Sequence, residues 1–138
     1  MADAGYRFTL DTGRVAATAQ PIIARKVASV TRRIAAQAKL NAPVRTGNLA
    51  RSIQEGPIVF QGPFRVTSGV TATANYAAAV HDGTRPHVIR ARNGGFLRFP
   101  GSDGSPVFRR SVNHPGTRPR PFLRNAAEQV MRSENLRQ

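Results

Sequence analysis

The 138-residue sequence contains no cysteine. A disulfide, a thiol nucleophile and a thiolate metal site are therefore excluded, and synthesis in a reducing cytosol is expected. No apolar run approaches the roughly 20 residues that a membrane helix needs, and the first residues lack a basic segment followed by an apolar one. We expect a soluble protein without a signal peptide and without a membrane partner.

Large apolar side chains are also scarce. Valine, isoleucine, leucine and phenylalanine together number 31, whereas alanine alone accounts for 20 residues. Because alanine buries little apolar area, a subunit of this length should be only modestly stable by itself. The length fits a single domain over residues 1–138, and we expect neighbouring molecules to complete its burial.

Acidic residues number only seven, against 21 lysines and arginines, which gives a net charge of +14 at pH 7. Such an excess attracts polyanions and acidic proteins. Nineteen of the 21 cations are arginine, a bias that suits planar hydrogen bonding to carboxylates and phosphates. A GC-rich genome would produce the same bias, so the choice of arginine leaves both explanations open.

The N-terminal third predicts one long helix. Residues 6–10 alternate apolar and polar side chains, which indicates a short strand within an N-terminal arm of residues 1–11. Asp11 and Thr12 then offer a helix cap, and apolar residues follow at helical spacing to Leu40. Pro21 either kinks this helix or lies in the first turn of a helix that starts near Thr18.

The remaining chain predicts short elements separated by turns, and an α+β fold as a whole. We expect an antiparallel sheet of about four to six strands, packed against the one long N-terminal helix, with short helices and a C-terminal helix. The expected elements are a short helix carrying Leu49 and Ile53, a hairpin of 64–67 with 70–74, a helix over 75–83, a hairpin of 88–91 with 96–99, a strand over 107–112, a helix that opens at Pro119 or Pro121, and a frayed end over 133–138.

Residues for catalysis are hard to find. His81, His87 and His114 have no partners at zinc-ligand spacing, and the seven carboxylates are scattered along the chain. A glycine-rich phosphate loop followed by lysine is absent as well. We therefore expect no metal, no cofactor and no enzymatic activity.

One six-residue segment occurs twice with five identities, as HDGTRP at 81–86 and HPGTRP at 114–119. Six residues do not make a structural repeat. They predict two turns of similar shape, each of which presents an arginine and a threonine hydroxyl beside a glycine.

Three segments together carry a family resemblance: APVRTGNL at 42–49, YAAAVHDGT at 76–84 and HPGTRPRPFL at 114–123. In this order and at these distances the chain resembles the tail-component family of long-tailed bacteriophages, made with the head-to-tail joining and tail-completion genes. The resemblance implies a virion protein assembled in the bacterial cytoplasm. It would act in the neck or upper tail, in a homo-oligomeric ring that is expected to be hexameric. The implied neighbours are a connector or stopper, a tail terminator or the tail tube.

Two groups of residues follow as candidates for this assembly role. The proposed interface residues are Arg25, Arg32, Arg85, Arg118, Arg120, Phe122 and Leu123, and the proposed turn residues are Pro43, Thr46, Gly47, Gly83, Thr84, Gly116 and Thr117. For the arginines, forked donors to carboxylates on adjoining subunits compete with plain surface solubility. For the glycines, a backbone requirement is the simpler explanation.

The alternative function is non-specific binding of nucleic acid, including contact with packaged DNA. The net charge would supply a strong, salt-sensitive attraction to phosphates. The sequence patterns of specific nucleic-acid-binding modules are missing, and the basic residues are spread over the whole chain.

Overall fold

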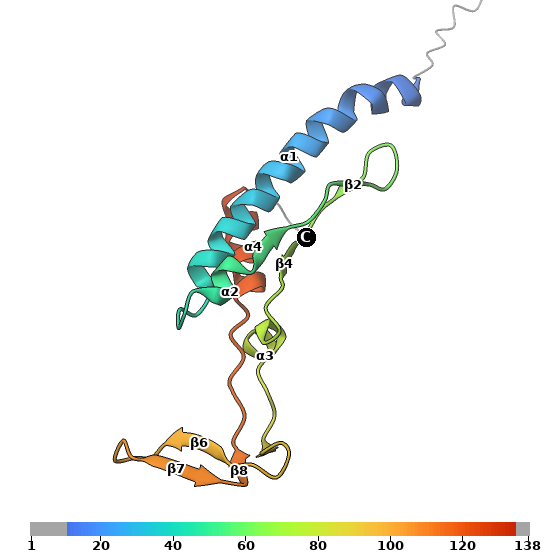
Figure 1. Ribbon diagram of the computed structural model, residues 1–138. Helices are drawn as coiled ribbons and strands as arrows, with labels where there is room; N and C mark the ends of the chain where they lie inside the picture. Colours follow the sequence, from blue (N-terminus) through green and yellow to red (C-terminus); the bar gives the residue numbers. More distant parts are fainter. Residues whose placement is uncertain (1–10, 135–138) are drawn as a thin grey trace, which may run out of the picture. The chain divides into compact units, whose positions relative to one another are not determined.

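The computed structural model describes residues 11–134, and these divide into two compact units (Figure 1). Unit 1 comprises residues 11–74 and 122–134, and unit 2 comprises residues 75–121. The strand expected over residues 6–10 and the last residues of the expected frayed end lie outside the described residues. The single domain expected from the chain length stays a prediction.

Helix α1 spans Thr12–Asn41 and is the longest element of unit 1. Its predicted cap is confirmed, because the Asp11 carboxylate accepts hydrogen bonds from the backbone N–H groups of Gly13 and Arg14, at 3.0 and 3.2 Å. Pro21 lies inside the helix, so the alternative start near Thr18 is wrong. At the other end, the Ala42 N–H donates to the Ala38 carbonyl at 2.9 Å, and the extended backbone of Ala42 stops the helix.

The core of unit 1 forms where α1 packs against α4, which spans Phe122–Ser133. The predicted apolar face of the C-terminal helix is confirmed, and its three residues Phe122, Ala126 and Val130 are all buried. Ala38 on α1 and Ala126 on α4 are both fully buried. Small side chains at these positions let two helices approach closely, so alanine here contributes by shape more than by apolar area.

The rest of unit 1 is a short helix and a twisted antiparallel ribbon. Helix α2 spans Asn48–Arg51, and the strands are β1 Ile53–Glu55, β2 Val59–Phe60, β3 Val66–Thr67 and β4 Val70–Ala72. Strand β1 pairs with β4, and β2 pairs with β3. The hairpin predicted between 64–67 and 70–74 is therefore wrong. The chain instead turns at Gly62, where the Gln61 N–H donates to the Arg65 carbonyl at 2.8 Å.

Unit 2 contains helix α3 Ala77–Asp82 and strands β5 His87–Arg90, β6 Leu97–Pro100, β7 Pro106–Arg109 and β8 Ser111–His114. Strand β5 pairs with β8, and β6 pairs with β7, all antiparallel. The predicted pairing of 88–91 with 96–99 is wrong, and the single strand predicted over 107–112 is divided between β7 and β8.

The α+β class is confirmed, but the strands differ in arrangement from the expected sheet. They form four sheets of two strands each. Within unit 1, the long helix lies against β1, β3 and β4 in addition to α4. None of the helices in residues 11–134 is both long and apolar enough to cross a bilayer.

Candidate assembly interface

The two copies of the repeated segment meet face to face in unit 2. Thr84 and Thr117 occupy the same place in the two copies, and they form an antiparallel bridge. Each donates its backbone N–H to the other's carbonyl, at 3.1 and 3.0 Å, and their hydroxyl oxygens lie 3.1 Å apart. We call Gly83, Thr84, Gly116 and Thr117 the clasp. The two copies of the repeat are thus paired with each other through one isolated bridge.

Both glycines of the clasp are required by their surroundings. Gly83 has φ +74° and Gly116 has φ +86°, in the region that side chains with a Cβ rarely adopt. A Cβ on Gly83 would lie 2.6 Å from the Thr117 carbonyl oxygen, and a Cβ on Gly116 would lie closer still to the Thr84 carbonyl oxygen. The close approach of the two strands therefore depends on glycine at both positions.

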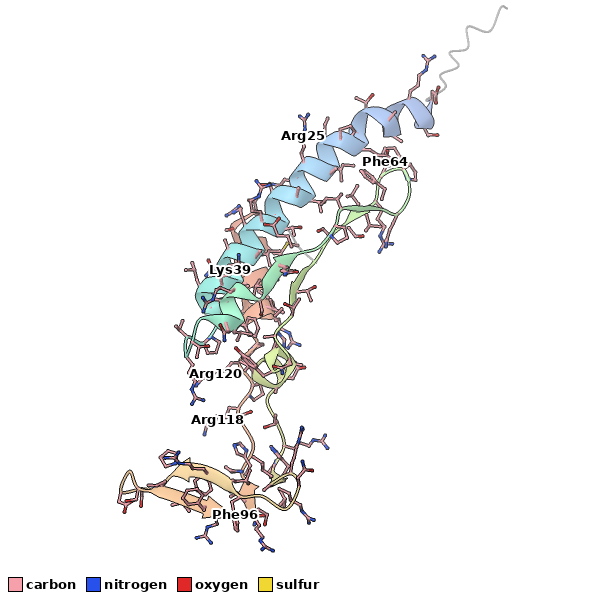
Figure 2. All side chains as sticks on the ribbon, in the orientation of Figure 1. Arg25, Lys39, Phe64, Phe96, Arg118 and Arg120 are labelled. Atoms are coloured by element: carbon pink, nitrogen blue, oxygen red, sulfur yellow. The ribbon has the colours of Figure 1, made fainter. Side chains whose placement is uncertain are left out.

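A two-stranded arm, residues 85–115, extends from the clasp and contains β5 to β8. Its register continues the clasp without a shift, since His87 pairs with His114 three residues after the Thr84–Thr117 bridge. No residue of the arm is buried. Phe96 and Phe108 are 62% and 59% exposed, and Phe96 is labelled in Figure 2.

The far end of the arm closes through an aspartate turn. The Asp103 carboxylate accepts the Ser105 backbone N–H and the Ser105 hydroxyl, both at 3.0 Å. These hydrogen bonds, the backbone one first, hold the pKa of Asp103 below its ordinary value. The Gly101 N–H donates to the Ser105 carbonyl at 2.7 Å, which completes the turn between β6 and β7.

The predicted interface arginines fall into two groups. Arg85 and Arg118 follow the two threonines of the clasp, and Arg120 lies next to Arg118 in the segment before α4 (Figure 2). All three side chains are exposed, and the Arg120 backbone N–H donates to the Val80 carbonyl at 2.9 Å. Arg25 and Arg32 are exposed on α1 in unit 1. The contact role of each stays a prediction.

Other cations of α1 are occupied within unit 1. Lys26 and Arg33 both form ion pairs with Glu134, whose side chain is only 16% exposed. Arg33 also donates to the Ser133 hydroxyl at 3.1 Å. These contacts fasten the end of α4 to α1, so the cationic face of the long helix is partly structural.

Phe122 and Leu123 begin helix α4, and neither side chain is exposed. Phe122 is 2% exposed and belongs to the core of unit 1, and Leu123 is half-buried. Phe122 thus packs the closing helix within unit 1, as the sequence suggested. The contact role of Phe122 and Leu123 toward a neighbouring protein stays a prediction.

The first predicted turn lies directly before helix α2. Gly47 has φ +75° and stands at the N-cap position of this helix. Arg51 donates to the Thr46 carbonyl at 2.8 Å and to the Asn48 side-chain oxygen at 3.1 Å. Pro43 follows the end of α1 and is half-buried. These contacts fix the backbone between two helices.

The histidines make local hydrogen bonds. The His87 and His114 rings lie 5.0 Å apart, between their centroids. The His87 Nδ1 lies 2.8 Å from the Arg85 carbonyl oxygen, and the His114 Nδ1 accepts the Gly116 N–H at 3.0 Å. Over residues 11–134, no group of three or more histidines and carboxylates could hold a metal ion.

Sequence reasoning missed the exposed phenylalanines of the arm and the arginines beside them. Phe108 stands directly opposite Arg98 in the ladder of β6 and β7, and the Arg110 guanidinium lies 5.6 Å from the centre of the Phe96 ring. One signal was present: Phe108 and Arg109 break the apolar alternation of residues 107–112. When a strand has no buried face, its apolar and charged residues need not alternate, and they can stand side by side on the surface.

Comparison with known families decides the relationship. The family model described as "Bacteriophage HK97-gp10, putative tail-component" matches residues 8–83, which is more than half of the chain. The chain belongs to this family. This tail-component family places the protein among the structural components of bacteriophage virions. The match covers α1 to α3 and ends at Gly83, so the arm and α4 lie beyond it. A search of curated proteins and a search of solved structures find no match.

Proposed function

We propose that this tail component is a ring subunit of the phage neck or upper tail, where it joins head to tail or completes the tail. Its role is assembly and not catalysis. The family match supports the tail assignment. The observation that carries the assembly role is the arm, a two-stranded ribbon without a single buried residue. A lone two-stranded ribbon is at best marginally stable in water, so a neighbour in the particle is expected to cover it.

The ring is proposed to contain six copies and to contact a connector or stopper, a tail terminator or the tail tube. Arg85, Arg118 and Arg120 supply exposed guanidinium groups that can donate two parallel hydrogen bonds to a carboxylate. None of the three forms an ion pair with another residue of the described chain. Their donors are available to neighbouring proteins of the particle.

Image reconstruction of the virion neck tests this function directly. The expected result is density for this chain in a closed ring at the head-to-tail junction. An intact particle without the chain would contradict the proposal, as would a chain present in one copy away from the neck.

A double variant tests the arginines. Arg118→Ala with Arg120→Ala should lower the yield of complete particles at least tenfold while the circular dichroism spectrum is unchanged. The matched control replaces Arg45 and Arg65 by alanine and should assemble normally. Both are exposed, and neither side chain forms an ion pair within residues 11–134. Unchanged infectivity of the first variant would refute the assignment of these arginines.

Binding to packaged DNA is the second candidate, and one observation favours it. Arg25, Arg32 and Lys39 follow one another at intervals of seven along α1, and all three are exposed. Figure 2 labels Arg25 and Lys39. If they contact phosphates, affinity for a DNA duplex should fall steeply with salt, and replacing one of them should reduce the salt slope by about one. A connector whose arginines face protein carboxylates should bind free duplex weakly at physiological salt.

A further inference from the structure

We propose that the arm docks on an acidic surface with an apolar centre that belongs to a different virion protein, and neither on a second copy of this chain nor on DNA. This inference rests on the proposed function, because it assumes that the chain is part of a particle. It concerns residues beyond the family match, which ends at Gly83.

The first step concerns uncovered apolar surface. Within the arm, Val88, Phe96 and Phe108 are each more than half exposed. Soluble proteins rarely gather exposed large apolar side chains on a narrow ribbon unless that surface meets a partner. The side chains stand on paired strands whose backbone is fixed by the ladders of β5 with β8 and β6 with β7. The ladders therefore set where the phenylalanines stand along the ribbon, and a partner that covers them would also stabilise the strand pairing.

The second step concerns what surrounds the phenylalanines. Arg98 is the cross-strand partner of Phe108, Arg109 is the next residue, and Arg110 stacks on Phe96 at 5.6 Å. Aromatic residues and arginine are the types most enriched at the energetic centres of protein interfaces, whereas lysine is depleted there. Both lysines of the chain lie on α1 in unit 1, and the arm has none.

The third step concerns charge. The arm contains six arginines and one carboxylate, Asp103, which is occupied by Ser105. Within residues 11–134, none of these six guanidinium groups takes part in an ion pair. A partner that covers the phenylalanines must therefore also neutralise several cations, which an acidic surface does.

Within residues 11–134, a second copy of this chain offers few carboxylates that lack a partner of their own. Of the six acidic residues in the described part of the chain, five already have a partner of their own: Asp11, Asp82, Asp103, Glu128 and Glu134. Only Glu55 has none there. The arms of two copies would also repel each other, because each arm carries six arginines and one carboxylate. We therefore expect contacts between copies in the ring to use surfaces other than the arm.

DNA would neutralise the arginines but leave the phenylalanines unexplained. Binding along a duplex backbone depends on cations and gains little from apolar side chains. A protein surface uses both kinds of side chain, and for this reason we choose it over DNA.

Photochemical cross-linking in assembled particles tests the proposal. The full chain is produced during infection with the photoreactive residue p-benzoylphenylalanine in place of Phe108, and in a second variant in place of Phe96. Phe60, which is 53% exposed in unit 1, is the matched control position. After irradiation of purified particles, the adducts are identified by mass spectrometry. The expected result is an adduct with one other virion protein from positions 108 and 96, at least tenfold stronger than from position 60.

Charge variants show whether the adduct reports docking on an acidic surface. Added to the photoreactive chain, Arg98→Glu with Arg109→Glu should lower the adduct yield at least tenfold, whereas Arg98→Lys with Arg109→Lys should retain most of it. Equal yields from the two pairs would overturn the proposal, as would equal yields from positions 108 and 60.

The remaining outcomes separate this inference from the proposed function. Adducts with a second copy, adducts with DNA, or no adduct from a chain that is present in the particle would each overturn the docking proposal and leave the tail role intact. Absence of the wild-type chain from purified particles would overturn the tail role itself.

Discussion

Replacing Gly116 by alanine is expected to open the clasp, and the cost can be estimated by comparison with Gly94. Both glycines have positive φ, +86° and +69°, so alanine is strained at either position. They differ in space. Apart from Gly94 itself and its two chain neighbours, no residue has an atom within 4 Å of a Cβ built there. A Cβ on Gly116 would collide with the Thr84 carbonyl oxygen and lie 2.9 Å from the Arg85 carbonyl carbon.

The magnitudes follow from these surroundings. The left-handed backbone alone costs alanine about 1 kcal/mol, and this is the whole effect expected for Gly94→Ala. At Gly116 the two strands must also separate, which weakens the pair of backbone hydrogen bonds between Thr84 and Thr117. At about 1 kcal/mol for each bond, the total reaches about 3 kcal/mol. The difference of about 2 kcal/mol between the variants corresponds to roughly a 30-fold change in an opening equilibrium.

Amide hydrogen exchange measures this opening locally. Exchange at the Thr84 and Thr117 amides should be roughly 30-fold faster in Gly116→Ala than in Gly94→Ala. Gly83→Ala should behave like Gly116→Ala, since its Cβ would lie 2.6 Å from the Thr117 carbonyl oxygen. Equal exchange in the Gly94 and Gly116 variants would refute the claim that the clasp requires glycine for close approach.

Three further changes have defined outcomes. Phe122→Ala should lower the free energy of unfolding by about 3–5 kcal/mol in urea denaturation, because it leaves a cavity between α4 and α1. The control Phe64→Ala, at a half-exposed position, should lower it far less. Similar losses in the two variants would count against the assigned core. Glu134→Gln should lower the free energy of unfolding by about 1 kcal/mol at low salt and by less at high salt, because it removes the negative charge shared by two cations of α1. A loss independent of salt would contradict the ion-pair explanation. Because the pKa of Asp103 is lowered in the folded chain, the Asp103 carboxylate stabilises the turn fully above the ordinary aspartate pKa. This stabilisation is lost as the pH falls through the lowered value. The NMR signal of the Ser105 amide should follow this titration, and Asp103→Asn should abolish it.

The two long helices were predictable because their signals are local. Asp11 caps α1, apolar residues recur at helical spacing along it, and the face of α4 can be read from Phe122, Ala126 and Val130. Each signal lies within a few residues of the contact that it specifies. The sequence left open whether the helix begins at the Asp11 cap or near Thr18. The answer depends on whether the Asp11 cap outweighs the helical hydrogen bond that is lost at Pro21.

Strand pairing was less predictable because two turns competed for the same strands. Asn93 and Gly94 do form a tight turn, with φ of +53° and +69°. It lies within one side of the arm, however, and does not join two paired strands. The turn that reverses the arm is 101–105, closed by Asp103. Residues 97–100 therefore pair forward with 106–109, and the selection depends on cross-strand contacts that local turn chemistry does not reveal.

The candidate site shows the same limit from another direction. The repeat of Gly-Thr-Arg-Pro was visible in the sequence, and so were the arginines that follow each threonine. That the two copies pair with each other was not, because residues 33 positions apart meet only through the register of the whole arm. The exposed phenylalanines were hidden for a related reason: an apolar residue in a strand normally indicates a covered face, and in the arm there is no second layer to cover it.

The buried core of unit 1 and the uncovered arm of unit 2 therefore differ in what their side chains contribute to the free protein. In unit 1, alanine at Ala38 and Ala126 lets two helices close over a small core, and the ion pairs of Glu134 are satisfied internally. In the arm nothing is buried, so a substitution at Phe108 or Arg98 removes little that holds the free protein together. Replacing these side chains should change the free energy of unfolding of the free subunit little, yet exposed apolar side chains of this size are unfavourable in water. A partner that covers them in the assembled particle explains both properties best.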